Sequence, residues 1–220
     1  MRLYLSSERI GDRAGSLLAL TGSGRRAANI ANGYDHVAAE LRQLFSARYV
    51  DPADELRALG YDTVDLDLRD YFGAPQRLRR ALEGVDLVWV PGGNAFVLRR
   101  AMRQSGFDDL VTELLDADAL VYGGADAGAM VAAPTLEGLD MLSDPAVTPI
   151  GYQALVPWDG LGLIDHSIVT HYRSPTPDSA GAERAVRYLS RKGLRYRALR
   201  DGEAIIWVES RGTGLGRAVA

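Results

Sequence analysis

The residue in this sequence that is best placed to do chemistry is Asp126. It lies in the run Gly-Ala-Asp-Ala-Gly from Gly124 to Gly128, which Gly123 separates from the apolar residues Leu120–Tyr122. A G-x-D-x-G run between a strand and a helix has the form of a nucleophile elbow, with aspartate where serine is usual. Small neighbours are needed there because the central residue sits on a sharp turn with its side chain exposed. The adjacent N–H of Ala127, at the start of a helix, would stabilise a developing negative charge.

The same run also has a purely structural interpretation. Gly123, Gly124 and Gly128 would permit a helix to pack closely on the sheet, and Asp126 would cap that helix. The spacing alone leaves both interpretations open.

A second glycine-rich turn follows another apolar strand. Residues 86–90 are a predicted buried strand, and Gly92, Gly93 and Asn94 follow it. Their free backbone N–H groups would face the same crevice as Asp126, which is what an oxyanion hole built from two loops requires. A tight turn that binds nothing is the alternative.

His171 is the histidine best placed to act as a base. It directly follows a predicted short strand, whereas His166 lies on the approach to that strand and His36 on a predicted helix surface. Asp201, in a turn near the C-terminus, or Asp140, after the elbow helix, would orient its ring. The structural alternative for each is a hydrogen-bonded histidine at a strand end or a solvated turn acid.

These residues must be positioned by a sheet whose strands end at one edge. The predicted strands at 86–90 and 119–122 are each followed by a glycine-rich turn and a helix, which indicates βαβ crossovers. Ligands of such sheets bind beyond the carboxyl ends of the strands. We therefore expect an α/β fold, a mostly parallel sheet with helices on both faces. The other predicted elements are strands at 2–7, 26–31, 61–68 (with one polar face or at a sheet edge) and 167–170, helices at 35–45, 51–60 and 180–190, a loop at 15–24 and a hairpin at 196–208.

The composition is that of an ordinary globular protein. A length of 220 residues suffices for one domain with a sizeable core, and 47% hydrophobic residues exclude disorder as the main state. We expect a single domain over residues 1–220 with a flexible tail from about Ser210. The absence of cysteine excludes disulfides, thiolate metal sites and a cysteine nucleophile.

Charge and apolar patterning limit the partners. A net charge of −4 argues against a nucleic-acid surface. No apolar run approaches the roughly 18 residues of a membrane span, and the charged N-terminal segment is unlike a signal peptide, so we expect a cytoplasmic protein. With separated histidines and no nucleotide-binding fingerprint we expect no metal and no cofactor. The expected partner is a small peptide or another small molecule, and whether the chain forms a homodimer stays open.

Four segments together resemble the peptidase E (aspartyl dipeptidase) family: PGGNAFVLRRAM, VYGGADAGAMVAAP, GLGLIDHSIVTHY and ALRDGEAI. The resemblance runs from Arg2 to about Val208. It implies the class I glutamine-amidotransferase-like fold, a flavodoxin-like three-layer sandwich. It also implies hydrolysis of dipeptides with an N-terminal aspartate, or of related small peptides. The site residues that it implies are Asp126 as nucleophile, His171 as base, Asp201 or alternatively Asp140 as acid, and Gly92, Gly93 and Ala127 at the oxyanion hole.

The chain departs from this family's pattern at the nucleophile. The family motif reads G-x-S-A-G, and Asp126 stands where the serine would be. A carboxylate, with a reference pKa of about 3.9, is already ionised at neutral pH, so His171 has no hydroxyl proton to remove. The amidotransferase-type glutaminases are disfavoured, because their chemistry needs a cysteine at this position.

Three hypotheses remain for the chemistry of such a site. In the first, Asp126 attacks an sp³ carbon and forms an ester, which water activated by His171 then hydrolyses. In the second, Asp126 and His171 together activate water as general bases. In the third, the site is catalytically inactive and binds a peptide or metabolite.

Overall fold

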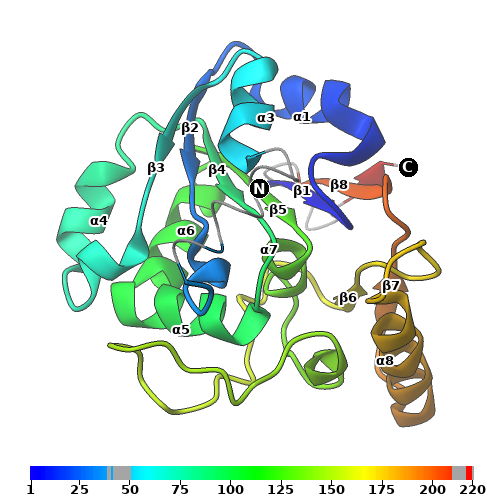
Figure 1. Ribbon diagram of the computed structural model, residues 1–220. Coiled ribbons are helices and arrows are strands. Elements are labelled where there is room, and N and C mark those ends of the chain that lie inside the picture. The colour runs from blue at the N-terminus through cyan, green and yellow to red at the C-terminus, as the bar shows by residue number, and fades with distance from the viewer. Residues whose placement is uncertain (39–40, 42–50, 210–216, 220) are drawn as a thin grey trace.

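The computed structural model describes residues 1–38, 41, 51–209 and 217–219. Within these residues the largest sheet has seven strands in the order β3-β2-β4-β5-β1-β8-β9 (Figure 1). The neighbours from β3 to β1 pair in parallel, whereas β8 pairs antiparallel with β1 and β9. The strand bounds are β1 (Arg2–Ser6), β2 (Arg26–Asn29), β3 (Asp62–Asp65), β4 (Leu87–Val90), β5 (Val121–Ala125), β8 (Ala204–Val208) and β9 (Arg217–Val219). The predicted α/β fold with a mostly parallel sheet is confirmed.

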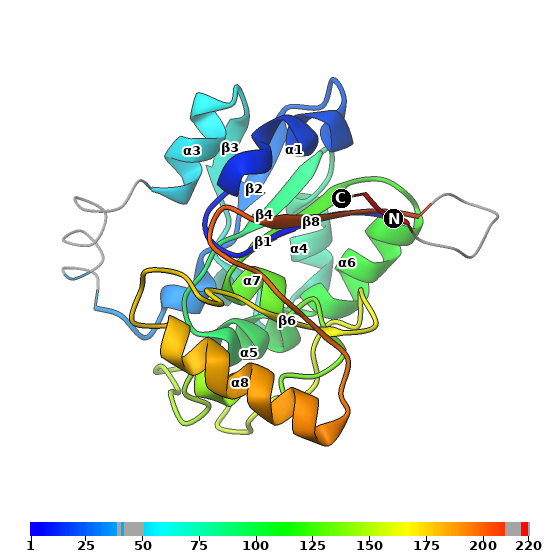
Figure 2. The same cartoon turned by 90° about the vertical axis from the view of Figure 1, so that its right-hand side faces the viewer.

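Helices cover both faces of this sheet (Figure 1 and Figure 2). Helices α1 (Ala14–Thr21) and α3 (Pro52–Ala58) lie on one face, and α4 (Pro75–Ala81), α5 (Ala95–Ser105), α6 (Phe107–Asp116) and α7 (Ala127–Met130) on the other. Because side chains alternate along a strand, β1 contributes to both cores. Leu3 and Leu5 pack under α5 to α7, while Tyr4 packs with Leu17 of α1 and Leu56 of α3.

A second, two-stranded sheet lies beside the main one. It pairs β6 (Ser167–Val169) in parallel with β7 (Tyr196–Ala198), and α8 (Ser179–Lys192) connects the two strands (Figure 1). Short 3-10 turns complete the elements: η1 (Gly11–Arg13), η2 (Asn32–Tyr34), η3 (Leu68–Tyr71) and η4 (Leu139–Met141). The segment after β6 reaches the carboxyl end of β5, which is where the site lies.

Several predicted elements are confirmed with small differences at their ends. The predicted helix from 51 to 60 is α3, with the Asp51 side chain accepting from the Ala53 N–H and Pro52 at the first position. The predicted strand at 61–68 is β3, which lies at the edge of the sheet as expected. In the part of the chain that the structure describes, no helix is both long and apolar enough to span a membrane.

The predicted hairpin at 196–208 is wrong. Both of its strands exist, but β7 pairs with β6, and β8 pairs with β1 and β9. The turn at Asp201 therefore joins two sheets. The alternating pattern of a strand does not reveal its partner, and here β1 and β6 each offer a free edge.

The predicted loop at 15–24 is also wrong, because residues 14–21 form α1. Leu17 and Leu20 bury their side chains there, and the run of leucine and alanine favours a helix despite the flanking glycines. The predicted helix at 35–45 falls mainly on residues outside the described part of the chain, as does most of the tail from Ser210.

Candidate active site

Asp126 lies at the turn between β5 and α7, beyond the carboxyl end of the middle strand of the sheet. Its φ of 49° and ψ of −111° are rare for a residue with a side chain. The backbone packs so closely around this turn that the positions of Gly124 and Gly128 have no room for a side chain. A Cβ at Gly124 would lie 2.4 Å from the carbonyl oxygen of Gly128, and one at Gly128 would lie 1.9 Å from that of Val90. The Asp126 side chain makes no capping hydrogen bond to α7, so its carboxylate faces the site instead.

The Asp126 carboxylate is contacted by Thr170 and His171, which directly follow β6. The Thr170 hydroxyl donates to Asp126 Oδ1 over 3.0 Å, and His171 Nε2 lies 3.4 Å from the same oxygen. The other ring nitrogen, Nδ1, lies 2.7 Å from Asp201 Oδ1. The side chains of Asp126 and His171 are 24% and 12% exposed, so a ligand can still reach them. Asp126, His171 and Asp201 thus form one row, which we call the Asp–His–Asp row.

Buried hydroxyls hold the far end of this row. Ser7, directly after β1, accepts from the backbone N–H of His171 over 2.8 Å and donates to Asp201 Oδ1 over 3.0 Å. The backbone N–H of Asp201 in turn donates to Ser174 Oγ over 2.9 Å. His171 has a positive φ of 57°, a strained conformation that these bonds help to maintain.

The electrostatics of the row determine the protonation of His171. Burial lowers the pKa of the ring, but the hydrogen bond and charge of Asp126, together with those of Asp201, outweigh burial and raise the pKa to about 9. At neutral pH the ring is therefore an imidazolium between two carboxyl groups.

The turn after β4 lies opposite the row. A Cβ at Gly92 would lie 2.7 Å from Asp126 Oδ2, and a Cβ at Gly93 would lie 2.5 Å from the carbonyl carbon of Gly33. Position 93 therefore requires glycine, whereas a side chain at position 92 would have to displace the Asp126 carboxylate. Within the described residues no hydrogen bond engages the N–H groups of Gly92, Gly93 or Ala127. These groups are thus available to a ligand, and their role as an oxyanion hole stays a prediction.

Asn94 does not offer the free donor that we predicted. Its Oδ1 accepts from the Phe96 and Val97 N–H groups at the start of α5, and its Nδ2 donates to the carbonyl of Asp144. Its backbone N–H donates to the Gly33 carbonyl over 2.8 Å. Asn94 shapes the turn as a helix cap, a role that the polar residue before an apolar helix could have indicated.

Comparison with known proteins assigns the chain to a family. Residues 45–213 match the model of peptidase family S51. The chain belongs to peptidase family S51. An uncharacterized peptidase of Listeria innocua is 27% identical over 69% of this chain and 68% of its own length, and a peptidase E of Streptomyces coelicolor is 30% identical over 62% of this chain. The latter match spans about half, 54%, of the Streptomyces protein.

The solved structures agree on the fold of this S51 chain. The crystal structure of a protein from Listeria monocytogenes EGD-e, described as a peptidase E, superposes with a TM-score of 0.75 at 21% identity, covering 100% of this chain and 98% of the other. The chain therefore has the class I glutamine-amidotransferase-like fold of the peptidase E proteins.

The remaining candidates of the S51 chain are not part of the described row. Asp140, the alternative acid, is exposed on η4, and the acid beside His171 Nδ1 is Asp201. His166 pairs with its neighbour Asp165, and His36 is exposed after η2. Neither histidine has a described contact with the row.

Sequence reasoning missed three residues around the row: Ser7, Thr170 and Tyr34. Ser7 follows β1 and Tyr34 lies on η2, which follows β2. Each therefore comes after the carboxyl end of a strand close to β5. Because ligands of parallel sheets bind beyond these strand ends, that position could have identified both residues. Thr170 directly precedes His171 and was visible only as the last residue of the predicted strand.

Proposed function

We propose that this chain is a small-molecule hydrolase built on the peptidase E scaffold, with Asp126 in place of the serine as its nucleophile. The proposal is carried by the Asp–His–Asp row, in which the Asp126 carboxylate lies 3.4 Å from one nitrogen of His171 and Asp201 lies 2.7 Å from the other. A nucleophile, a base and an orienting acid in that order are the parts of a covalent hydrolase site.

Ordinary serine-type cleavage of peptides does not fit an aspartate. If Asp126 attacked a peptide carbonyl, the product would be a mixed anhydride. Its carboxylate would leave far more readily than the amine, so the adduct would revert. The substrate that fits is instead a small molecule with an electrophilic sp³ carbon that bears an oxygen leaving group, such as an epoxide.

The protonated His171 ring suits both steps of such a reaction, the formation of the ester and its hydrolysis. In the first, Asp126 Oδ2 bonds to the carbon, the carbon–oxygen bond breaks, and the leaving oxygen takes the proton of the His171 imidazolium. Because the ester carries no charge, the main cause that raises the pKa of His171 disappears. The neutral ring is then a base.

In the second half, His171 takes a proton from water as the water oxygen adds to the ester carbonyl carbon. The N–H groups of Gly92 and Ala127 would bind the resulting oxyanion. Collapse expels the product alkoxide, which takes the proton from His171. The Asp126 carboxylic acid then returns its proton to the ring, which restores the starting state.

The second candidate is a family member that binds a small peptide or metabolite without turnover. The pKa of about 9 favours it, because a resting imidazolium held between two carboxyl groups cannot serve as a base at neutral pH. For the same reason we rank below both candidates a site in which Asp126 and His171 activate water directly.

Hydrolysis assays on matched variants separate these candidates. We would test aspartyl-leucine, simple esters and phenyl glycidyl ether with the native protein, Asp126→Ser and His171→Ala. The proposal expects the native protein to open the epoxide to a diol and to leave the dipeptide intact. It expects Asp126→Ser to cleave the dipeptide and His171→Ala to complete neither reaction.

Two results would overturn the proposal. Cleavage of aspartyl-leucine by the native protein but not by Asp126→Ser would show that aspartate serves peptide hydrolysis after all. Saturable binding of the dipeptide to the native protein, measured by calorimetry without turnover of any substrate, would establish the binding function instead.

A further inference from the structure

Tyr34 shares the space in front of Asp126. It is the last residue of η2, and about a third of its surface, 36%, is exposed. A Cβ at Gly92 would lie 3.0 Å from the Tyr34 phenol oxygen and 2.7 Å from Asp126 Oδ2. The phenol and this carboxylate oxygen therefore border the same small volume, which the missing side chain of Gly92 leaves open.

The phenol is in a state to donate a hydrogen bond. Burial, and after it the negative charge of Asp126, raise the pKa of Tyr34 well above its ordinary value of 10.0. The hydroxyl therefore keeps its proton wherever the protein is folded at moderate pH. Among the described residues, no hydrogen bond contributes to the shift of its pKa, so the phenol is available as a donor.

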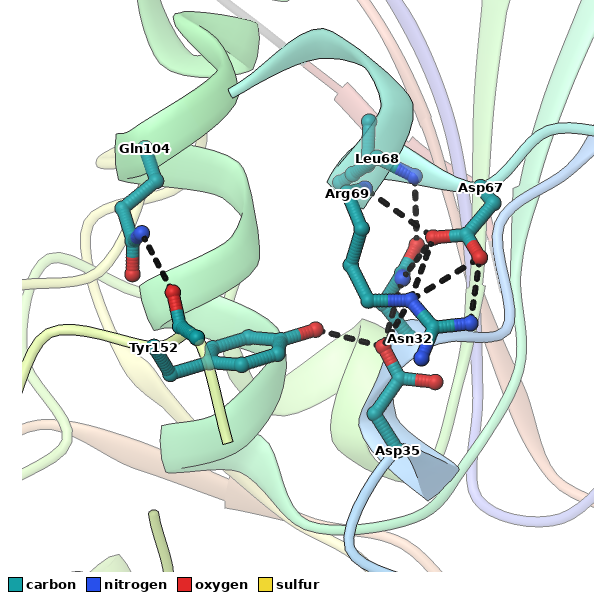
Figure 3. Close-up of polar contacts among 8 residues, drawn as sticks. Asn32, Asp35, Asp67, Leu68, Arg69, Gln104 and Tyr152 are labelled. Atoms are coloured by element: carbon teal, nitrogen blue, oxygen red, sulfur yellow. Dashed lines mark hydrogen bonds and ion pairs between the residues drawn. The ribbon is translucent and has the colours of Figure 1, made fainter. Parts of the chain in front are cut away.

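A buried polar network fixes the short turn that carries Tyr34. Asn32, at the start of η2, donates to Asp67 over 2.8 Å and accepts from the Leu68 N–H over 3.0 Å, which ties η2 to η3. Asp35, next to Tyr34, accepts from the Asn32 amide over 2.7 Å and from the Tyr152 phenol (Figure 3).

Further contacts make this turn rigid on both sides. Arg69 Nε lies 3.5 Å from Asp35 Oδ2, and the Asp35 side chain is only 3% exposed. On the side of the site, the Gly33 carbonyl accepts from the N–H of Asn94. A residue held between these anchors has little freedom to leave the site, so Tyr34 is placed in advance for a ligand.

We propose that Tyr34 is a substrate-contacting residue of this site, whose phenol donates a hydrogen bond to the leaving oxygen of a substrate bound against Asp126 Oδ2. This inference rests on the proposed function and adds the group that recognises the oxygen. The phenol keeps its proton during the step, and the proton that the leaving oxygen takes comes from His171. Tyr34 would thus stabilise the charge that develops on the leaving oxygen before that oxygen takes the proton of His171.

The shared space can be tested without any substrate. An ultraviolet titration of the native protein minus that of Tyr34→Phe isolates the signal of this phenol. We expect it to ionise above pH 10.0, its ordinary value, and to shift to lower pH when Asp126→Asn removes the nearby charge. Ionisation at the ordinary value with no response to Asp126→Asn would overturn the placement of Tyr34 beside Asp126.

The role in the reaction is tested by the rate at which phenyl glycidyl ether alkylates Asp126, followed by mass spectrometry. Tyr34→Phe should slow alkylation about tenfold, the effect of losing one hydrogen bond in the transition state. The control is Tyr196→Phe, because Tyr196 begins β7 at the end of the small sheet remote from His171. An equal rate in native protein and Tyr34→Phe overturns the role.

A different assay applies if the native protein neither forms an adduct nor opens the epoxide to a diol, in which case the proposed nucleophile has failed. The Tyr34→Phe change is then made in Asp126→Ser and assayed on aspartyl-leucine. A fall in kcat/KM there supports Tyr34 as a substrate contact in a peptidase. Unchanged kinetics, or no cleavage by Asp126→Ser, overturn the inference.

Discussion

His171 works in a different charge state from a histidine that serves a hydroxyl nucleophile. Two carboxyl groups flank its ring, so the proton that a serine would have supplied is already bound at neutral pH. In the proposed reaction the row would therefore release a proton first and accept one later. Formation of the ester on Asp126 would convert the first state into the second.

The raised pKa of His171 predicts how stability depends on pH. The folded-state pKa of about 9 exceeds the ordinary value of 6.5, so protonated His171 stabilises the fold fully below the lower value. This stabilisation, on the order of 3 kcal/mol, is lost as the pH rises through the higher one. Urea unfolding of the native protein at a series of pH values should show that decline.

Asp126→Asn is the control for this prediction, because it removes the charge and keeps the size of the side chain. It should bring the pKa of His171 down and flatten the decline. Parallel profiles for the native protein and Asp126→Asn would contradict the assignment of the raised pKa to Asp126.

Ser7 is predicted to hold His171 and Asp201 in place through its hydroxyl. Ser7→Ala leaves the backbone N–H of His171 without its acceptor in a buried position, and should lower the free energy of unfolding by about 1–3 kcal/mol. Ser190→Ala, which removes an exposed hydroxyl bonded to Tyr196, is the matched control and should cost much less. Equal losses in chemical denaturation would argue against the buried role of Ser7.

At the scale of elements, the turn from β5 to α7 depends on the space that its glycines leave. Gly128→Ala would place a methyl group 1.9 Å from the Val90 carbonyl oxygen, so β4 and α7 would have to move apart. We expect a loss of at least about 1–3 kcal/mol in unfolding free energy, or failure to fold.

Gly15→Ala is the control for this steric argument. Gly15 lies within α1 and has no neighbour within 4 Å of an added Cβ, so alanine there should stabilise the protein by about 0.5–1 kcal/mol. If thermal unfolding showed the same change for both variants, the close contact of α7 with β4 would not be what requires Gly128.

At the scale of the whole molecule, the sequence predicts most of what holds the site and little of how distant segments meet. The buried strands at 86–90 and 119–122 and the turns after them are local patterns. The sequence alone therefore places Asp126, Gly92 and Gly93 at the carboxyl ends of the strands. The pairing of β7 with β6 could not be predicted, because strand periodicity carries no information about the partner. For the same reason the sequence could not show that Ser7, Thr170 and Tyr34 lie beside the row, although each follows or ends a strand.

Trapping of the ester would show directly whether Asp126 is the nucleophile. His171→Ala protein incubated with phenyl glycidyl ether should carry one adduct, mapped by mass spectrometry to the peptide with Asp126, and the adduct should persist because no base activates water. In the native protein the adduct should decay to diol, and in Asp126→Asn none should form. His171→Ala also lacks the ring that protonates the leaving oxygen, so its adduct should form more slowly than in the native protein. No adduct in His171→Ala together with no diol from the native protein, or equal labelling of Asp126→Asn, would contradict Asp126 as the nucleophile.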